Sequence, residues 1–201
     1  MRSSSRLLMV CGPNGAGKST YTKVAKVRDR FPVIDPDKIA IDGALSPIAA
    51  GREAYRRTKE FLTKGLSFVR ESTLTANFDF NLMREAKEKG YDVSIAYIGL
   101  NSGQEAIERV KFRQSLGGHG VPEEDVLRRF ERGLNNLPKA IALADRVRLI
   151  DNSKSYVLVA DIERGQIITE YQKPHQRPDW YRIVRRIARE QGVPFSVVPD
   201  S

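Results

Sequence analysis

A glycine-rich segment near the N-terminus constrains this chain more than any other feature of its sequence. Residues 12–19 read Gly-Pro-Asn-Gly-Ala-Gly-Lys-Ser, which satisfies the Walker A pattern G-x-x-x-x-G-K-[ST]. Glycines let the backbone curl until successive N–H groups point inward at a phosphate. The lysine adds a positive charge beside the β- and γ-phosphates, and the serine hydroxyl can ligate Mg²⁺. The segment therefore predicts a loop that binds ATP and Mg²⁺, with Ser19 as the metal ligand, made by Gly12, Pro13, Asn14, Gly15, Ala16, Gly17, Lys18, Ser19 and Thr20.

The sequence on either side of this segment supports the same interpretation. Residues 7–11 form a short apolar run typical of a buried strand, and a helix is expected to begin near Lys18. A helix N-terminus at this point adds its dipole to the binding of an anion. The alternative, a glycine-rich turn with a chance lysine, does not require this order of strand, loop and helix.

Strands and helices alternate along the rest of the chain. We expect strands at 7–11, 31–35, 66–71, 91–100 and 147–151, and helices from about 18 and over 51–63, 77–89, 104–114 and 122–144. This order predicts an α/β protein of P-loop NTPase fold, with a doubly wound, mostly parallel sheet covered by helices on both faces. Residues 155–161 and 166–171, joined through Arg164-Gly165, predict an added β-hairpin. A basic C-terminal helix should follow over 179–189.

Length and composition indicate one globular domain. The 201 residues are 40% hydrophobic and 29% charged, which allows a single domain (1–201) with a core over about 6–151 and a C-terminal part over 155–191. Cys11, the only cysteine, lies in an apolar run and is expected to be a core residue in a reducing compartment. Because we find neither a secretion signal nor a run of membrane length, we expect a cytoplasmic protein without a membrane partner.

The formal net charge of +9 bears on the ligands of the protein. It indicates either a polyanionic ligand, which would be a nucleic acid or a phosphorylated metabolite, or simply a soluble basic surface. Part of the excess lies near the C-terminus, in Lys173, Arg177, Arg182, Arg185, Arg186 and Arg189. No RNP, zinc-finger or homeodomain signature accompanies these residues, so nucleic acid is not the favoured partner.

Two other classes of P-loop protein are disfavoured. GTPases read guanine with an N-K-x-D element, and the nearest string here, Asn152-Ser153-Lys154-Ser155, lacks the aspartate. Residues 115–119, Ser-Leu-Gly-Gly-His, are similar to the signature loop of ABC-transporter ATPase subunits. That class requires an apolar strand ending in Asp-Glu shortly afterwards, whereas a long polar helix is expected here.

Carboxylates follow two of the expected strands. Pro36 ends the second strand, so Asp37 should lie just beyond it, beside the crevice where ligands bind in such sheets. Asp37 is our candidate for the general base that accepts a hydroxyl proton, and the alternative is an N-cap on a helix that starts at Lys38. For Asp35 the cap is the favoured role. Glu71 ends the third strand and could hold an Mg²⁺-bound water or an acceptor hydroxyl; the alternative is a charge that leaves the sheet edge.

Together these segments resemble the zeta-toxin-like kinases, including a compact bacterial branch known as predicted ABC-type ATPases. The resemblance covers about residues 6–151, and its shared segments are 12–20, 33–37, 71–73, 108–113, 117–122 and 128–130. It implies a doubly wound kinase that transfers the γ-phosphate of ATP to a hydroxyl of a small molecule. In the toxins this acceptor is the nucleotide sugar UDP-N-acetylglucosamine, and an antitoxin protein is a candidate partner.

The resemblance also implies roles for single residues. Lys18 and Ser19 would bind ATP and Mg²⁺, Asp37 would be the base, and Arg109 would clamp the phosphates. Arg113 and the loop 117–122 would belong to a lid. The catalytic candidates are therefore Lys18, Asp37, Arg109 and Arg113, and the substrate-binding candidates are Glu71, Thr73 and His119.

Two assignments stay open at this point. The second clamping arginine is Arg113, Arg128 or Arg129, and the alternative is a solvated helix face paired with nearby glutamates. His119 either contacts substrate or caps the following helix.

Our first hypothesis is thus an ATP-dependent small-molecule kinase. The second is a nucleic-acid-binding ATPase that uses the basic C-terminal helix, and the third is a nucleotide-binding regulator without turnover. Stimulation of ADP release by a nucleotide sugar or by a polynucleotide would distinguish the first two.

Overall fold

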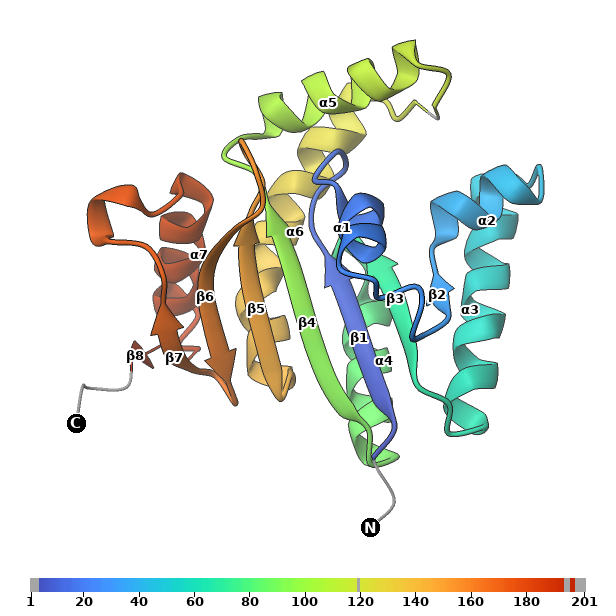
Figure 1. The fold of residues 1–201 in the computed structure, drawn as a ribbon, viewed down its shortest axis with the longest axis horizontal. Helices are drawn as coiled ribbons and strands as arrows, with labels where there is room; N and C mark the ends of the chain where they lie inside the picture. The colour runs from blue at the N-terminus through green and yellow to red at the C-terminus, as the bar shows by residue number, and fades with distance from the viewer. Residues whose placement is uncertain (1–3, 119, 194–195, 198–201) are drawn as a thin grey trace.

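The computed structural model describes residues 4–118, 120–193 and 196–197, and in this part of the chain eight strands form one sheet (Figure 1). The strands are β1 (Arg6–Cys11), β2 (Val33–Ile34), β3 (Phe68–Ser72), β4 (Asp92–Gly99), β5 (Arg146–Asp151), β6 (Val157–Glu163), β7 (Gln166–Glu170) and β8 (Ser196–Val197). The helices are α1 (Lys18–Val24), α2 (Pro36–Asp42), α3 (Pro47–Thr63), α4 (Asn77–Glu88), α5 (Gly103–Ser115), α6 (Glu123–Leu143) and α7 (Asp179–Glu190), with a 3₁₀ turn at Pro174–Gln176.

The order of the strands creates a crevice beside β1. The order is β2-β3-β1-β4-β5-β6-β7-β8, and the strands from β2 to β5 pair in parallel. The chain leaves β1 through α1, which lies in front of the sheet in Figure 1, and leaves the neighbouring β3 through α4, which lies behind it. Adjacent strands whose connections leave on opposite faces form a switch point, where ligands bind beyond the carboxyl ends of the strands. The loop after β1 and the end of β3 therefore face one site.

The predicted α/β fold with a mostly parallel sheet is confirmed. Strands β1 and β4 are buried on both faces, as the near-continuous apolar run of parallel strands requires: Leu7, Met9 and Val10 are completely buried, as are Val93 and Ile98. Helices α4, α6 and α7 lie behind the sheet in Figure 1. None of the helices within 4–118 and 120–193 combines the length and the apolar character needed to cross a lipid bilayer.

Helices lie on both faces of the sheet (Figure 1), as predicted, but part of the front face is exposed to solvent. Over β5 and β6 this face is polar: Arg148 donates to the Asp161 carboxylate at 2.9 Å, and Arg146 lies nearby with its side chain 66% exposed. Antiparallel pairing between β5 and β6 permits this, because such strands can keep one solvated face. The sequence shows the corresponding alternation in Arg146-Val147-Arg148-Leu149.

The segment after β2 differs most from the prediction. The strand is two residues long, and α2 begins at Pro36, where we expected no helix before Lys38. The reason is local, because the Asp35 carboxylate accepts the backbone N–H groups of Asp37 and Lys38 at 3.1 and 3.2 Å, and proline suits the first helical position. Asp35 is therefore the N-cap, as favoured, and the alternative that Asp37 caps the helix is wrong.

The predicted hairpin and basic helix are both present. Arg164 and Gly165 adopt left-handed conformations, with φ of 49° and 80°, and connect β6 to β7. Helix α7 then buries Trp180, Tyr181 and Val184.

Candidate active site

A cavity of about 680 Å³ opens at the carboxyl ends of β1 and β3. It brings together most of the predicted site residues: Asn14, Gly15, Gly17, Lys18, Ser19, Thr20, Asp37, Glu71, Thr73, Arg109 and Arg113. It also brings in residues that the sequence did not single out, namely Arg70, Asp79 and Arg132. The cavity thus has both the phosphate-binding loop and a group of carboxylates in its wall.

The phosphate-binding loop adopts the curled form that its glycines permit. Gly12 has a φ of 146°, and a Cβ there would lie 2.2 Å from the carbonyl oxygen of Ile98 on β4. Gly17 has a φ of 88° and is the N-cap of α1. The Lys18 ammonium donates to the carbonyl oxygens of Gly12 and Pro13, both at 2.9 Å. Burial lowers the pKa of Lys18, and the charge of Glu71 opposes this shift most.

One group in the loop lacks a partner in the described chain. The side-chain oxygen of Asn14 is buried and accepts no hydrogen bond from residues 4–118 or 120–193. Buried polar atoms in folded proteins are nearly always paired, so an orphan in this position marks a place where a ligand can bind.

Three oxygen-bearing side chains converge next to Lys18. The Ser19 hydroxyl donates to Glu71 Oε2 at 2.7 Å and lies 3.3 Å from Asp35 Oδ2. Glu71 is only 3% exposed, and burial raises the pKa of its carboxyl group, with the charge of Asp35 as the next cause. Hydroxyl and carboxylate oxygens are the ligands that Mg²⁺ prefers, so the donor set fits such an ion.

Glu71 is also held from behind by two residues that the sequence analysis missed. Its Oε1 accepts from Arg28 NH2 and from the Thr22 hydroxyl, both at 3.1 Å. Strand β3 lies between β2 and β1, so Glu71 does not leave the sheet at an edge, and that alternative is wrong. Arg28 lies 43 residues from Glu71 in the sequence, and no local pattern signals such a pair.

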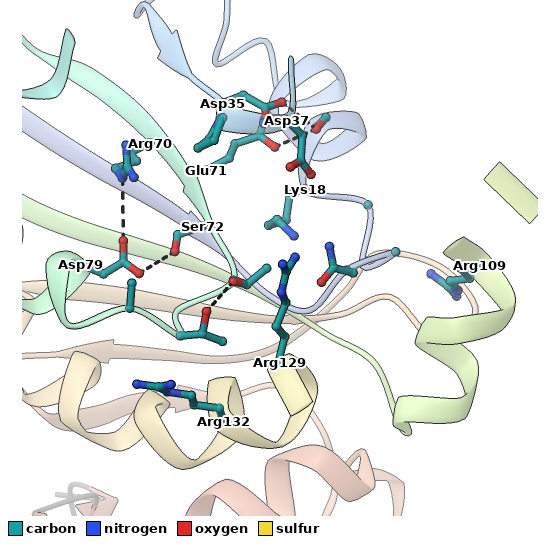
Figure 2. Close-up of a pocket in the computed structure, with 18 of the residues that line it drawn as sticks. Lys18, Asp35, Asp37, Arg70, Glu71, Ser72, Asp79, Arg109, Arg129 and Arg132 are labelled. Atoms are coloured by element: carbon teal, nitrogen blue, oxygen red, sulfur yellow. Dashed lines mark hydrogen bonds and ion pairs between the residues drawn. The ribbon is translucent and has the colours of Figure 1, made fainter. Parts of the chain in front are cut away.

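Asp37 stands in contrast to Asp35. Its side chain is exposed at the cavity wall, and Figure 2 shows it directed toward Lys18. In the described part of the chain no hydrogen bond or ion pair engages the Asp37 carboxylate, whereas both oxygens of Asp35 accept hydrogen bonds. The carboxylate that is left available is therefore Asp37.

A buried ion pair forms the far wall of the cavity. Arg70 Nε lies 3.8 Å from Asp79 Oδ1, and Asp79 accepts from the Ser72 hydroxyl at 2.7 Å (Figure 2). Burial lowers the pKa of Arg70 and raises that of Asp79. We expected Arg70 in a strand and Asp79 in a helix. A charged residue in such a segment is usually exposed, so no sequence pattern indicated this buried pair.

The loop between β3 and α4 is strained. Leu74 has a φ of 59°, which costs a non-glycine residue about 1–3 kcal/mol, and its side chain is completely buried. Asn136 of α6 donates to the Leu74 carbonyl oxygen at 2.9 Å and helps to hold the loop. The hydroxyls of Thr73 and Thr75 are 2.9 Å apart at the cavity wall.

The arginines around the cavity occupy different positions. Figure 2 shows Arg129 reaching from α6 toward Lys18, whereas Arg109 lies on α5 at the opposite side of the loop. Arg109 NH2 bonds to Glu105 Oε1 at 2.8 Å and to the carbonyl oxygens of Asn152 and Ser153 at 2.6 and 2.8 Å. Its predicted phosphate contact therefore stays a prediction. His119 lies outside the described residues.

Comparison with known proteins agrees with this geometry. The family model for the zeta toxin matches residues 49–163. An uncharacterised protein of Haemophilus influenzae is 34% identical over 131 residues, which is 63% of this chain and 93% of that protein.

Two solved structures share the fold. A structure of the PezAT chromosomal toxin–antitoxin system of Streptococcus pneumoniae superposes with a TM-score of 0.57, at 14% identity, over 94% of this chain and 88% of that one. The AvrRxo1-ORF1:-ORF2 structure with ATP superposes with a TM-score of 0.67, at 16% identity, over 97% of this chain. The match spans 64% of the AvrRxo1 chain.

The family match, together with the sheet order and the phosphate-binding loop, identifies a nucleotide-binding P-loop kinase, a class of phosphotransferase. Because the family model covers more than half of its length, the chain belongs to the zeta toxin family.

Proposed function

We propose that this kinase transfers the γ-phosphate of ATP to a hydroxyl group of a small molecule, with Asp37 as the general base. The observation that carries the proposal is the Asp37 carboxylate, which is exposed at the cavity wall, directed toward Lys18 and engaged by no described residue. A base must be free to take a proton within reach of the acceptor. Asp35 and Glu71 are less suited, because Ser19 and other donors already bond to them.

The reaction that follows is an in-line displacement. The acceptor oxygen attacks the γ-phosphorus, the bond from this phosphorus to the bridging oxygen of ADP breaks, and the acceptor proton passes to the Asp37 carboxylate. Lys18 lies where charge builds up on the phosphates, and its ammonium group can leave the Gly12 and Pro13 carbonyls to contact them.

Ser19 is the residue that we assign to direct binding of Mg²⁺, with Asp35 and Glu71 beside it. When bound, Mg²⁺ would neutralise charge on the β- and γ-phosphates. Arg28 holds Glu71 from the other side at 3.1 Å and fixes the direction of its carboxylate.

Arg129 is our candidate for the second phosphate clamp. Its side chain points into the cavity toward Lys18, and its ion pair with Asp125 is 4.0 Å long. Arg128, one residue earlier, bonds to Asp125 at 2.5 Å and is 63% exposed, so it is less available. A planar guanidinium that remains charged can form paired hydrogen bonds with phosphate oxygens.

The acceptor we favour is a nucleotide sugar such as UDP-N-acetylglucosamine, since the chain belongs to the zeta toxin family. Thr73, Thr75 and the Arg70–Asp79 pair offer hydroxyl and charged groups in the wall of the cavity that Asp37 also lines. We also propose an antitoxin protein as a partner, because one structural neighbour is part of a toxin–antitoxin system.

The test is direct phosphorylation with γ-labelled ATP. We expect labelled UDP-N-acetylglucosamine with the wild-type protein and labelling that is about 10²-fold slower, or slower still, with Asp37→Asn. Labelled inorganic phosphate without a labelled acceptor would argue for a bare ATPase. A labelled metabolite other than the nucleotide sugar would keep the kinase and change its acceptor.

The nucleic-acid alternative has less support. Arg177 and Arg185, which contribute to the basic C-terminal part, bond to Glu170 at 2.5 and 3.0 Å. These two guanidinium groups therefore support the packing of α7 and are not presented to a phosphate backbone. ADP release stimulated by a polynucleotide would reverse this preference.

A further inference from the structure

The connection between β5 and β6 contacts the phosphate-binding loop through two residues that do not line the cavity. Asn152 Nδ2 donates to the carbonyl oxygen of Ala16 at 2.9 Å, across 136 residues of sequence. The Tyr156 hydroxyl donates to the carbonyl oxygen of Gly17 at 2.8 Å, across 139 residues. In Figure 1 this orange connection rises to the same end of the sheet as the loop between β1 and α1.

The contact is close enough to constrain the loop itself. A Cβ on Gly17 would lie 2.6 Å from the Tyr156 hydroxyl oxygen and 2.8 Å from Asn152 Nδ2. Real Cβ atoms do not approach other atoms so closely, so only glycine allows the two side chains to reach the neighbouring carbonyls.

Through the geometry of the peptide bond, these two contacts also set the directions of two backbone N–H groups. A trans peptide is planar, so the C=O of one residue and the N–H of the next point in opposite directions. When Asn152 holds the Ala16 carbonyl, it sets the direction of the Gly17 N–H. The Gly17 carbonyl accepts from the Tyr156 hydroxyl and, as the start of α1, from the Tyr21 N–H at 2.8 Å, so Tyr156 sets the direction of the Lys18 N–H together with the helix. Gly17 and Lys18 both line the cavity, and a hydrogen bond to the carbonyl of a peptide also makes the N–H of that peptide a stronger donor.

We propose that Asn152 and Tyr156 are positioning residues, which aim the N–H groups of Gly17 and Lys18 at the phosphates of the bound nucleotide. The proposal rests on the proposed function, because it requires a nucleotide in this loop. It gives the C-terminal part of the chain a role in the site without direct contact with the substrate.

The connection is itself held at several points. The backbone N–H of Asn152 donates to the Gly99 carbonyl at 3.0 Å, and Arg109 donates to the carbonyls of Asn152 and Ser153. The Ser153 hydroxyl donates to Asp151 Oδ1 at 3.0 Å, and the same oxygen accepts from Trp180 Nε1 at 2.8 Å. Trp180 belongs to α7 and is completely buried. The C-terminal helix thereby anchors the segment that holds the phosphate-binding loop.

The test compares two variants with two matched controls in the same part of the chain. Asn152→Ala and Tyr156→Phe remove the two donors. Tyr171→Phe and Gln172→Ala remove a hydroxyl and an amide that bond elsewhere, to a carboxylate at 2.8 Å and to the Leu158 carbonyl at 3.2 Å. The affinities of ADP and of adenosine are measured by displacement of a fluorescent ADP, together with thermal unfolding without nucleotide.

We expect each test variant to bind ADP about 3- to 10-fold more weakly, the equivalent of one lost hydrogen bond. Adenosine carries no phosphate, so its affinity should change less than about 2-fold, and the controls should match the wild type. Equal losses for ADP and adenosine, or no loss in either variant, would overturn the proposal.

Two further outcomes have separate meanings: a variant that fails to fold, and a wild type that does not bind ADP. If Asn152→Ala fails to fold, Tyr156→Phe decides alone, because it removes one oxygen atom from a side chain that is 37% exposed. If the wild type itself does not bind ADP, the proposed function fails and this proposal fails with it. Unchanged variants of a wild type that binds ADP would remove only the positioning role.

Discussion

The Asp35 carboxylate accepts the backbone N–H of Asp37 at 3.1 Å, so one carboxylate starts the helix that presents the other. Asp35 also accepts from Ser19 at 3.3 Å and thus connects this helix start to the phosphate-binding loop. Asp37, in the first turn of α2, keeps its own carboxylate available at the cavity wall. Two acids separated by one proline therefore have different roles, which their neighbours determine.

This division predicts different effects for two matched substitutions. Asp37→Asn should leave folding and ATP affinity nearly unchanged, because the side chain is exposed and bonds to no described residue. It should lower phosphoryl transfer by about 10²-fold or more, since an amide cannot accept the hydroxyl proton. Steady-state kinetics, ATP titration and thermal unfolding of the same preparations would check this.

Asp35→Asn is the comparison. Asparagine caps a helix about as well as aspartate, so the free energy of unfolding should change by less than about 1 kcal/mol. Transfer should fall less than in Asp37→Asn. If Asp35 proves the more sensitive position, the base is misassigned but the enzyme is still a kinase. Full phosphoryl transfer in both variants would show that neither carboxylate is the base.

Lys18→Ala should abolish the stabilisation of the protein by ATP. The Lys18 ammonium is the cation fixed inside the curled loop, and its loss leaves the loop without that charge. At an ATP concentration of 100 times Kd, the wild type should gain about 2.7 kcal/mol, and the variant almost none. Lys23→Ala on the exposed side of the same helix is the control. Normal ATP binding by Lys18→Ala would show that the nucleotide binds elsewhere.

The sequence was most informative where the determinants of structure are local. The glycines of the phosphate-binding loop, the apolar runs of β1 and β4, and the Arg164-Gly165 turn each act within a few residues, and each was predicted. We predicted the start of α2 two residues too late. Asp35 was correctly favoured as the N-cap, but a cap at Asp35 means that the helix begins at Pro36 and not at Lys38.

The site itself was predictable only in part. Arg28, Arg70 and Asp79 were missed, because a buried ion pair brings together residues whose sequence separation carries no signal. The contacts of Asn152 and Tyr156 with the phosphate-binding loop span more than half of the chain and depend on the order of the strands. Local patterns cannot specify such distances.

Cys11 should be unreactive in the folded protein. The sequence predicted a core residue, and this is confirmed, since the side chain is completely buried. Burial raises the pKa of the Cys11 thiol, so the reactive thiolate does not form where an ordinary thiol begins to ionise. Between pH 7 and 9, iodoacetamide should label the native protein at least about 10-fold more slowly than the urea-unfolded chain. Rapid labelling of native protein would mean that β1 opens readily.

The last prediction concerns the arginine that clamps the phosphates. Arg129 points toward Lys18, whereas Arg128 bonds to Asp125 and is 63% exposed. A clamp contributes most where charge moves during transfer, so Arg129→Ala should lower kcat by about 10²-fold while ATP affinity falls less than about 5-fold. Arg128→Ala should change kcat less than about 3-fold, because this guanidinium is occupied by Asp125 and exposed to solvent.

Both variants remove the same side chain from neighbouring positions of α6, so a general effect of lost positive charge would lower both activities equally. The measurement is the split between kcat and Kd for ATP, with single-turnover transfer to separate chemistry from product release. Equal losses of kcat and affinity in Arg129→Ala would mark a ground-state contact. A larger loss in Arg128→Ala would move the clamp by one residue, and this would mean that the Arg128–Asp125 pair breaks when nucleotide binds.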